Sequence, residues 1–332
     1  MKMMLKVLLI ILVVLVIVFL YCFLIAKGPQ QKNITFGIDF SQMQAENLKL
    51  NWKETYLSIL DDLKVKNIKL HTQWDFVEGQ KGNYYFNDID WQIQQAEQRN
   101  ANIIYVVGMK TGRWPECHLP TWANSLAQQQ QQKEILAYIQ EVVLRYKNSK
   151  AIVAWQAENE PLFNFGICPW YDKDFLKSEV SLIKSLDATR PVIISDSGEQ
   201  SSWFKAASIG DIVGTTMYRT AWVSIYKKFG FYVNFPLSSM SYWIKAQIIK
   251  KVFGKEVINV ELQAEPWAPT LFYDIPLKEQ EKTMNLAKFQ ANVEFARHAG
   301  MKQYYFWGVE WWYWLKTTQH KPEIWDEAKT LF

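Results

Sequence analysis

Residues 151–161 read AIVAWQAENEP. The first seven form a nearly continuous apolar run, which is typical of a parallel strand that is buried on both faces. The run then gives way to Glu158, Asn159, Glu160 and a proline. We therefore expect a buried strand that ends at a loop rich in carboxylates.

Runs of the same kind recur along the chain and alternate with amphipathic stretches. Eight strand–helix units in roughly 300 residues match a (β/α)₈ TIM barrel, an α/β fold, in count, order and size. Besides 151–157, the expected strands are 34–40, 67–71, 102–108, 191–195, 211–217, 256–261 and 303–308. The expected helices are 51–65, 88–99, 128–147, 172–187, 199–208, 237–252, 277–299 and one near 321–332.

A doubly wound open sheet is the rival fold. It usually carries a glycine-rich turn after its first strand, but here residues 39–43 read DFSQM. The barrel is therefore favoured. Barrel enzymes carry their functional side chains on the loops after the carboxyl ends of the strands, so those loops are searched first.

The charge distribution argues against a nucleic-acid partner. The chain has 37 basic and 33 acidic side chains. Four of the basic ones lie in residues 1–32, which hold no acid, so the remaining 33 basic side chains balance the 33 acidic ones. A protein that neutralises several phosphates normally has a basic surplus.

A long apolar stretch precedes the barrel. Residues 7–26 carry no charge, and a helix of twenty residues covers about 30 Å, the thickness of a bilayer's hydrocarbon core. A secretory signal has a shorter apolar core and a small-residue cleavage site, which the sequence around Lys27 lacks. An uncleaved single-pass membrane anchor is favoured, and a cleaved signal is the alternative.

The basic residues Lys2 and Lys6 favour a cytoplasmic N-terminus, which would leave the barrel outside the cytoplasm. The expected organisation is a short cytoplasmic N-terminus (1–6), a transmembrane helix (7–26), a linker (27–33) and the catalytic barrel (34–332). Within that barrel Cys117 and Cys168 fall on neighbouring loops, where they either pair or remain two free thiols. No motif indicates a metal or cofactor, and the sequence does not indicate an oligomeric state.

Carboxylates and aromatic residues gather at the expected strand ends. Glu160 follows the fourth strand, Glu261 ends the seventh, Tyr218 follows the sixth and Trp307 lies on the eighth. Hydrolysis of a glycosidic bond requires one carboxylic acid to protonate the leaving oxygen and a second carboxylate to act at the anomeric carbon. Aromatic rings supply flat apolar faces against which a sugar packs. The pattern predicts a carbohydrate substrate.

The tripeptide Asn159-Glu160-Pro161 at the fourth strand, with a glutamate about 100 residues later at the seventh, resembles the clan A glycoside hydrolases. These are retaining (β/α)₈ enzymes that include cellulase-like family 5 and β-galactosidase-like members. The resemblance spans residues 34–320. It implies that Glu160 is the general acid/base and that Glu261 is the nucleophile, with their carboxyl groups about 5–5.5 Å apart.

The resemblance also implies substrate contacts. Asn159 would hold the hydroxyl next to the anomeric carbon, Tyr218 would support the nucleophile, and Trp307 would floor the cleavage subsite. Trp74, His118 and Trp267 are further candidate substrate-binding residues. One departure is Lys69, which stands where many relatives carry an arginine. Glu265 is a competing nucleophile, although Glu261 directly ends the apolar strand.

Two classes of function fit these features. The first is a retaining O-glycoside hydrolase acting on β-linked oligo- or polysaccharides, and the second is a membrane-anchored carbohydrate-binding protein that keeps the cleft without catalysis. Retention of both glutamates favours the enzyme. An aldolase-like barrel ranks last, because Lys69 is its one strand-end candidate. The sequence leaves the sugar, the linkage and endo or exo action open.

Overall fold

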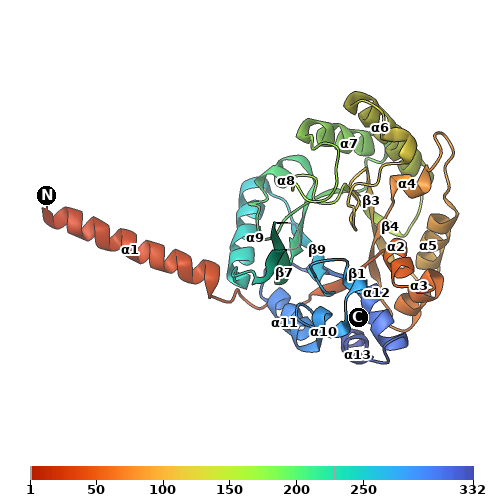
Figure 1. Ribbon diagram of the computed structural model, residues 1–332. Helices are drawn as coiled ribbons and strands as arrows, with labels where there is room; N and C mark the ends of the chain where they lie inside the picture. Colours follow the sequence, from red (N-terminus) through yellow and green to blue (C-terminus); the bar gives the residue numbers. More distant parts are fainter. Residues whose placement is uncertain (1, 227–228) are drawn as a thin grey trace.

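The computed structural model describes residues 2–226 and 229–332. Eight parallel strands close into a barrel in the order β1-β10-β9-β6-β5-β4-β3-β2, surrounded by helices (Figure 1). The (β/α)₈ prediction is confirmed, with every expected strand within two residues of its predicted ends. The strands are β1 (Thr35–Phe40), β2 (Asn67–His71), β3 (Asn102–Val107), β4 (Ile152–Ala157), β5 (Val192–Asp196), β6 (Ile212–Met217), β9 (Val257–Gln263) and β10 (Gln303–Trp307).

The helices follow the expected order, but those at residues 42–47, 74–77 and 309–317 were not predicted, and the expected helix 199–208 begins only at Phe204. The expected helix 277–299 is divided in two, because the side chain of Asn285 accepts a hydrogen bond from Lys288 N (3.0 Å) and caps a new helix. The helices are α2 (Gln42–Asn47), α3 (Trp52–Asp61), α4 (Trp74–Val77), α5 (Asn87–Gln98), α6 (Gln128–Tyr146), α7 (Lys173–Leu186), α8 (Phe204–Ile209), α9 (Ser239–Phe253), α10 (Leu277–Gln280), α11 (Leu286–Arg297), α12 (Val309–Thr317) and α13 (Glu323–Lys329), with short 3₁₀ turns at η1 (Thr121–Ala123) and η2 (Phe272–Asp274).

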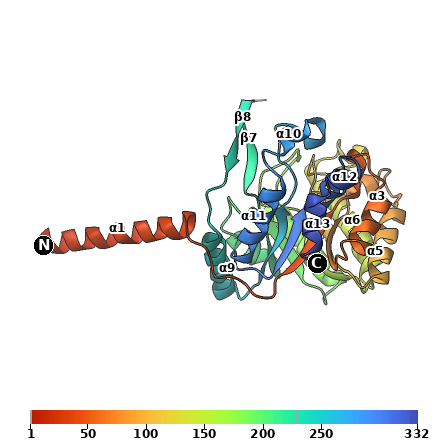
Figure 2. The same cartoon turned by 90° about the horizontal axis from the view of Figure 1, so that it is seen from below.

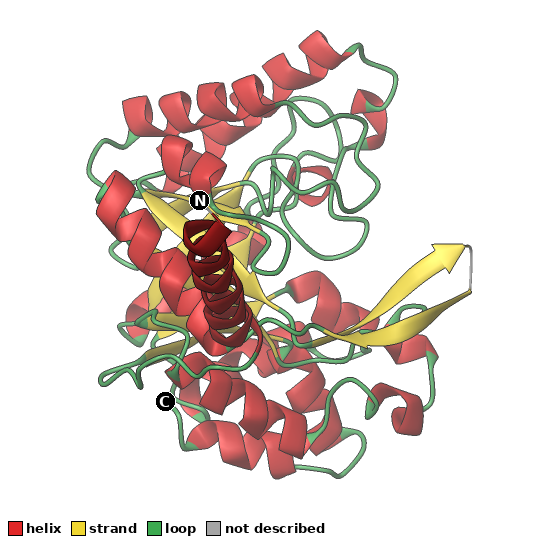
Figure 3. Cartoon of the chain, turned by 90° about the vertical axis from the view of Figure 1, so that its left-hand side faces the viewer, coloured by secondary structure: helices red, strands yellow, loops and turns green. Residues whose placement is uncertain are grey.

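An antiparallel hairpin, β7 (Thr220–Tyr226) and β8 (Phe229–Asn234), projects from the barrel (Figure 3). The sequence analysis did not predict it. Trp222 and Tyr232 pair on one face of the hairpin with ring centroids 5.0 Å apart. The opposite face carries Val223 and Phe231, which are exposed.

The barrel interior has an apolar base and a polar mouth. Its base is a cluster of buried side chains: Ile104, Ala154, Ile193, Ile258, Val260 and Tyr305. Gly37 on β1 makes room for Tyr305, since a Cβ there would lie 2.8 Å from carbons of that ring. Toward the mouth, the buried inner residues become polar, with Asp39, Lys69, Gln156 and Glu261 among them. This polar layer is where a reaction site can form.

A bulge in β9 gives Glu261 its direction. Ile258 and Val260 belong to the inner cluster, whereas Leu262 belongs to the outer core between sheet and helices. Strict alternation would turn residues 258, 260 and 262 to the same face. The register of β9 shifts against both β6 and β10 in this region, and such a bulge re-aims the side chain beside it. Glu261 therefore points into the barrel mouth.

The helix α1 (Lys2–Leu24) extends away from the barrel (Figure 2). Residues 3–24 are long and apolar enough to be a membrane anchor or a signal sequence, while Met1 lies outside the described residues. Ser238, at the start of α9, holds the last turn of α1: its N donates to Phe23 O (2.8 Å) and its Oγ to Cys22 O (2.6 Å).

Cys117 and Cys168 form a disulfide, with Cα atoms 5.2 Å apart. The sequence left the choice between this pair and two free thiols open. The bond joins the loop after β3 to the loop after β4, and both loops lie at the mouth of the barrel.

Candidate active site

The structure places Glu160 directly after β4, where its backbone is tightly held. Its N–H donates to Ser195 Oγ (2.8 Å), and Thr216 Oγ1 donates to its carboxyl Oε1 (3.0 Å). Its φ of 45° lies in the left-handed region, which a non-glycine residue adopts at a cost of about 1–3 kcal/mol. The surrounding hydrogen bonds hold the side chain in this conformation at the mouth.

Glu261 on β9 is held by two donors. Tyr218 OH donates to Oε2 (2.7 Å), and Lys69 Nζ lies 3.3 Å from Oε1. A hydroxyl and an ammonium therefore engage one oxygen each of this carboxyl group and fix its orientation. The arrangement suits a nucleophile that must be held in place.

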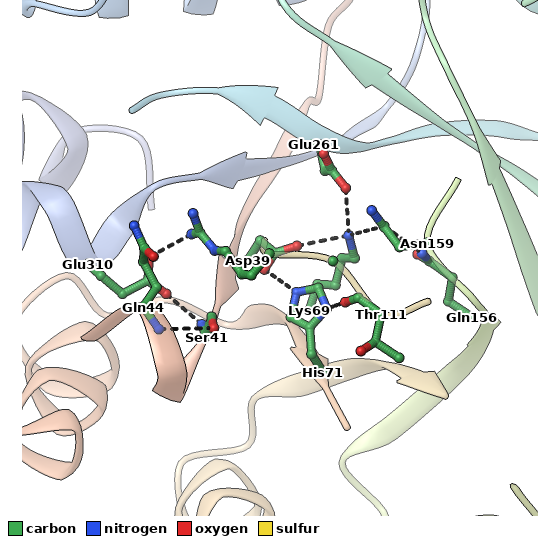
Figure 4. Close-up of polar contacts among 12 residues, drawn as sticks. Asp39, Ser41, Gln44, Lys69, His71, Thr111, Gln156, Asn159, Glu261 and Glu310 are labelled. Atoms are coloured by element: carbon green, nitrogen blue, oxygen red, sulfur yellow. Dashed lines mark hydrogen bonds and ion pairs between the residues drawn. The ribbon is translucent and has the colours of Figure 1, made fainter. Parts of the chain in front are cut away.

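Lys69 on β2 is the centre of a buried polar network (Figure 4). Its Nζ lies 2.9 Å from Asp39 Oδ2 and 3.2 Å from Asn159 Oδ1, in addition to its contact with Glu261. Burial alone would lower the pKa of Lys69, but the charges of Asp39 and Glu261 raise it above its ordinary value. The ammonium of Lys69 thus connects β1, β9 and the loop after β4.

Asp39 on β1 anchors that ammonium. Its other oxygen, Oδ1, lies 2.5 Å from His71 Nε2, and His71 Nδ1 contacts the carbonyl oxygen of Thr111 (Figure 4). Burial opposes ionisation, yet His71 and Lys69 lower the pKa of Asp39 to about 2. Asp39 therefore stays charged and fixes Lys69 against Glu261.

The amide of Asn159 has a defined orientation. Its Oδ1 accepts hydrogen bonds from Lys69 Nζ and from Gln156 Nε2, each at 3.2 Å. Its Nδ2 has no protein partner among the described residues, and the amide can therefore donate to a ligand. This matches the expected contact with a sugar hydroxyl, which stays a prediction.

The electrostatic environment separates the two carboxyl groups. Burial and the negative charge of Glu261 raise the pKa of Glu160 well above its ordinary value, against the opposing charge of Lys110. The raised pKa favours the protonated form of Glu160, whereas Glu261 faces a buried ammonium. Two carboxyl groups in such different environments at one mouth suit glycoside hydrolysis. The catalytic roles of both residues stay predictions.

The competing nucleophile, Glu265, is engaged elsewhere. Arg113 Nη1 contacts its Oε1, and Arg113 Nη2 lies 3.0 Å from Glu310 Oε2. The guanidinium also stacks 4.0 Å from the centroid of Trp307. Glu265 and Glu310 thus fix Arg113 beneath the ring of Trp307. Because Glu265 is engaged in this way, the geometry favours Glu261 as the nucleophile.

A cavity of about 660 Å³ opens beside these groups. Trp267 and Trp307 line it, and Trp267 also meets the ring of Tyr218 edge-on at 4.9 Å. Trp74 and His118 are not among the residues that line this cavity, and their role in substrate binding stays a prediction. Trp74 is fully buried against Trp122, and His118 is 1% exposed, with its Nε2 3.0 Å from Gly112 O.

Sequence reasoning missed several residues that shape this site. Asp39 and Arg113 act through pairs 30 or more residues apart in sequence, and no local pattern signals them. Glu116 lines the cavity, although its loop sequence, RWPECH, matched no known motif. Arg113 meets Glu265 and Glu310 only in the folded barrel, because the three residues are far apart in sequence.

Replacing Lys69 with methionine is expected to lower the free energy of unfolding by about 3–5 kcal/mol, because Asp39 and Glu261 remain buried without their shared partner. Urea titration of the full chain in detergent measures the change. Lys81→Met is the matched control: its ion pair with Glu134 is 57% exposed on the lysine side, and we expect a loss of less than about 1 kcal/mol. Equal losses in the two variants would contradict the network.

The chain was compared with known proteins. The model of glycosyl hydrolase family 10 matches residues 27–207. Among curated proteins, the chain is similar to mannan endo-1,4-beta-mannosidase A of Hypocrea jecorina, with 31% identity over 122 residues, which are 33% of this chain and 26% of that protein. It is also similar to the probable mannan endo-1,4-beta-mannosidase A-1 of Aspergillus terreus, with 40% identity over 117 residues, or 33% and 30% of the two chains. The chain thus spans less than a third of these relatives.

Solved structures share the fold at low sequence identity. A hyperthermostable endo-1,4-beta-D-mannanase from Thermotoga petrophila superposes with a TM-score of 0.55 and 17% identity, covering 82% of this chain and 88% of that one. A family 10 endo-beta-1,4-xylanase from Gloeophyllum trabeum superposes with a TM-score of 0.52 and 15% identity, covering 82% of this chain and 84% of that one. These likenesses bear on the barrel alone.

Proposed function

Because the chain belongs to glycosyl hydrolase family 10, we propose that it is a retaining β-glycoside hydrolase with Glu261 as nucleophile and Glu160 as general acid/base. The observation that carries the proposal is the opposite environment of the two carboxyl groups. Lys69 and Tyr218 each contact an oxygen of Glu261, whereas burial and the charge of Glu261 raise the pKa of Glu160.

In the proposed first step, a carboxylate oxygen of Glu261 attacks the anomeric carbon. The bond to the leaving oxygen breaks while Glu160 donates its proton to that oxygen. In the second step, Glu160 accepts a proton from water, and the water oxygen attacks the anomeric carbon and releases Glu261. Asn159 Nδ2 donates to the neighbouring sugar hydroxyl in both steps, and Trp307 packs against the ring.

For the substrate we propose a β-1,4-linked polysaccharide, with mannan first. The support is the similarity to the two fungal mannosidases named above. The test is a screen of the full chain in detergent against mannan, xylan, β-glucan and aryl β-glycosides. Release of reducing ends from mannan above the level of a Glu160→Ala, Glu261→Ala double variant is expected. Activity confined to another polysaccharide would contradict the choice of mannan, and inactivity on all would contradict hydrolysis.

We propose further that α1 is an uncleaved anchor and that the barrel lies outside the cytoplasm. The length and apolar character of residues 3–24 support this. The disulfide between Cys117 and Cys168 is also in keeping with an oxidising compartment. After a carbonate wash the protein is expected in the membrane fraction at its full mass of 39.1 kDa. A soluble form that begins near residue 27 would contradict the anchor and support a cleaved signal.

A further inference from the structure

The carboxyl group of Glu116 lines the cavity beside the proposed catalytic pair, and the residues that the structure describes give it no partner. Glu116 is 7% exposed and lines the 660 Å³ cavity. Across residues 2–226 and 229–332, no hydrogen bond or ion pair involves its carboxyl oxygens. The side chain is thus largely buried, while its carboxyl group is left to the cavity, where a ligand can supply the hydrogen bonds that the protein does not.

The backbone that carries Glu116 is held from several sides. Its φ is 77°, in the left-handed region. Its N–H donates to Arg113 O (2.6 Å) and its carbonyl accepts from Thr111 N (3.1 Å), while the next residue, Cys117, is bonded to Cys168. Strain of this kind persists only where the surrounding structure over-determines it, and it concentrates at ligand sites.

Glu116 packs against the loop that continues from Glu160. Gly166, in that loop, leaves room for it, since a Cβ on Gly166 would lie 2.5 Å from Glu116 Cβ. Lys110 Nζ ties the same loop down through Glu160 O (2.9 Å) and Phe163 O (2.8 Å). The proposed acid acts on the leaving oxygen, and this shared loop is our reason for assigning the Glu116 carboxyl to the leaving-group side.

Aromatic side chains line the cavity beside Glu116. Trp114, Phe165 and Trp267 all line it, and the ring of Phe165 lies 6.3 Å from Trp114 and 5.7 Å from Trp267. Trp114 is 49% exposed, which leaves part of its surface free to contact a ligand. An apolar wall beside a polar floor fits a neutral sugar, whose ring faces are apolar and whose edge carries hydroxyls.

Burial, with the charge of Glu261 adding to it and Lys110 opposing it, raises the pKa of Glu116 to about 7. Near neutral pH the group therefore exists in both protonation states and can donate to, or accept from, a hydroxyl. Its negative charge in turn contributes to the raised pKa of Glu160.

We propose that Glu116 binds the hydroxyl groups of the first neutral sugar on the leaving-group side of the cleft. This inference rests on the proposed hydrolase function and adds a recognition site for the leaving sugar. It predicts that replacing Glu116 lowers kcat/KM for substrates with a sugar leaving group and has little effect on kcat/KM for substrates with an aryl leaving group.

The test compares two probes in the full chain: β-1,4-mannotetraose, which has a sugar leaving group, and 2,4-dinitrophenyl β-mannoside, which has none. Glu116→Ala is expected to lower kcat/KM for mannotetraose by about 10- to 100-fold, mainly through KM, the effect of losing hydrogen bonds to an ionisable group. The value of kcat/KM for the aryl substrate should change less than about threefold.

Glu116→Gln should recover part of the loss and move the alkaline limb of the pH profile to lower pH. Glu294→Gln on α11, an exposed carboxyl far from the cleft, is the control for charge and should match wild type.

Equal losses on both probes, or none on either, would overturn the role of Glu116 while leaving hydrolysis intact. If the wild type cleaved neither probe, the proposed hydrolysis of mannosides would be contradicted. Calorimetry with mannotetraose would then test the binding role of Glu116 separately. Weaker binding by Glu116→Ala would support the recognition site, and affinity equal to that of wild type would refute it. Urea titration of each variant distinguishes these results from loss of folding.

Discussion

Replacement of Glu261 by alanine is expected to reduce hydrolysis of every substrate by about five orders of magnitude or more, the scale seen when an enzyme loses its nucleophile. No covalent intermediate can form without this carboxylate. The loss should be the same for aryl and sugar leaving groups, because both need the same attack on the anomeric carbon. Initial rates on an activated aryl glycoside measure it.

Glu265→Ala is the matched control, since Glu265 is the competing nucleophile four residues away and contacts Arg113. It is expected to lose some activity on the aryl glycoside through displacement of Arg113 beneath Trp307, but to remain far more active than Glu261→Ala because the nucleophile is still present. An inactive Glu265→Ala variant alongside an active Glu261→Ala variant would reverse the assignment of the nucleophile.

Replacement of Glu160 by alanine should depend strongly on the leaving group. For sugar leaving groups we expect a loss of about 10²–10⁴-fold, the usual contribution of general acid–base catalysis. A dinitrophenyl group departs without protonation, so formation of the intermediate should continue. Hydrolysis of the glycosyl-enzyme intermediate should remain slow until azide is added, because azide attacks the anomeric carbon without needing a general base.

The pH profile gives an independent check on Glu160. Its acid form is the active one, and its pKa is raised by burial and by Glu261. Activity on sugar substrates should therefore persist to a higher pH than an ordinary glutamic acid would allow, and fall as the pH rises through that raised pKa. The alkaline limb should disappear in Glu160→Ala assayed on the dinitrophenyl substrate. Equal, azide-insensitive losses in the Glu160 and Glu261 variants would contradict the separation of roles.

The sequence was sufficient to predict the barrel because its signals are local. Each buried strand is a short apolar run such as residues 102–108, and each is followed by an amphipathic stretch of helical period. The hairpin of β7 and β8 was missed because its strands lack a common buried face: Trp222 lies on one side, whereas Ile225 is 73% exposed. Part of its stability comes from contacts distant in sequence, such as Tyr232 OH to Glu279 (2.5 Å).

The candidate site was predictable to the extent that its residues end strands. Glu160, Glu261, Asn159, Tyr218 and Trp307 were named from their positions, and the structure brings them to one mouth. The direction of Glu261 was not predictable, because it depends on the β9 bulge. The burial of Trp74 and His118 was not predictable, because a loop aromatic or histidine has the same sequence signature whether it is buried or exposed.

The most direct test of the account is to trap the intermediate. A 2-deoxy-2-fluoro glycoside with a dinitrophenyl leaving group, carrying the sugar that the substrate screen identifies, slows release of the intermediate more than its formation. Intact-mass and peptide mass spectrometry of the full chain should then show one fluoroglycosyl unit attached to Glu261. The same reagent should leave Glu261→Ala unmodified. A label on Glu265 or any other residue, or no label despite turnover of the parent substrate, would contradict the proposed double displacement.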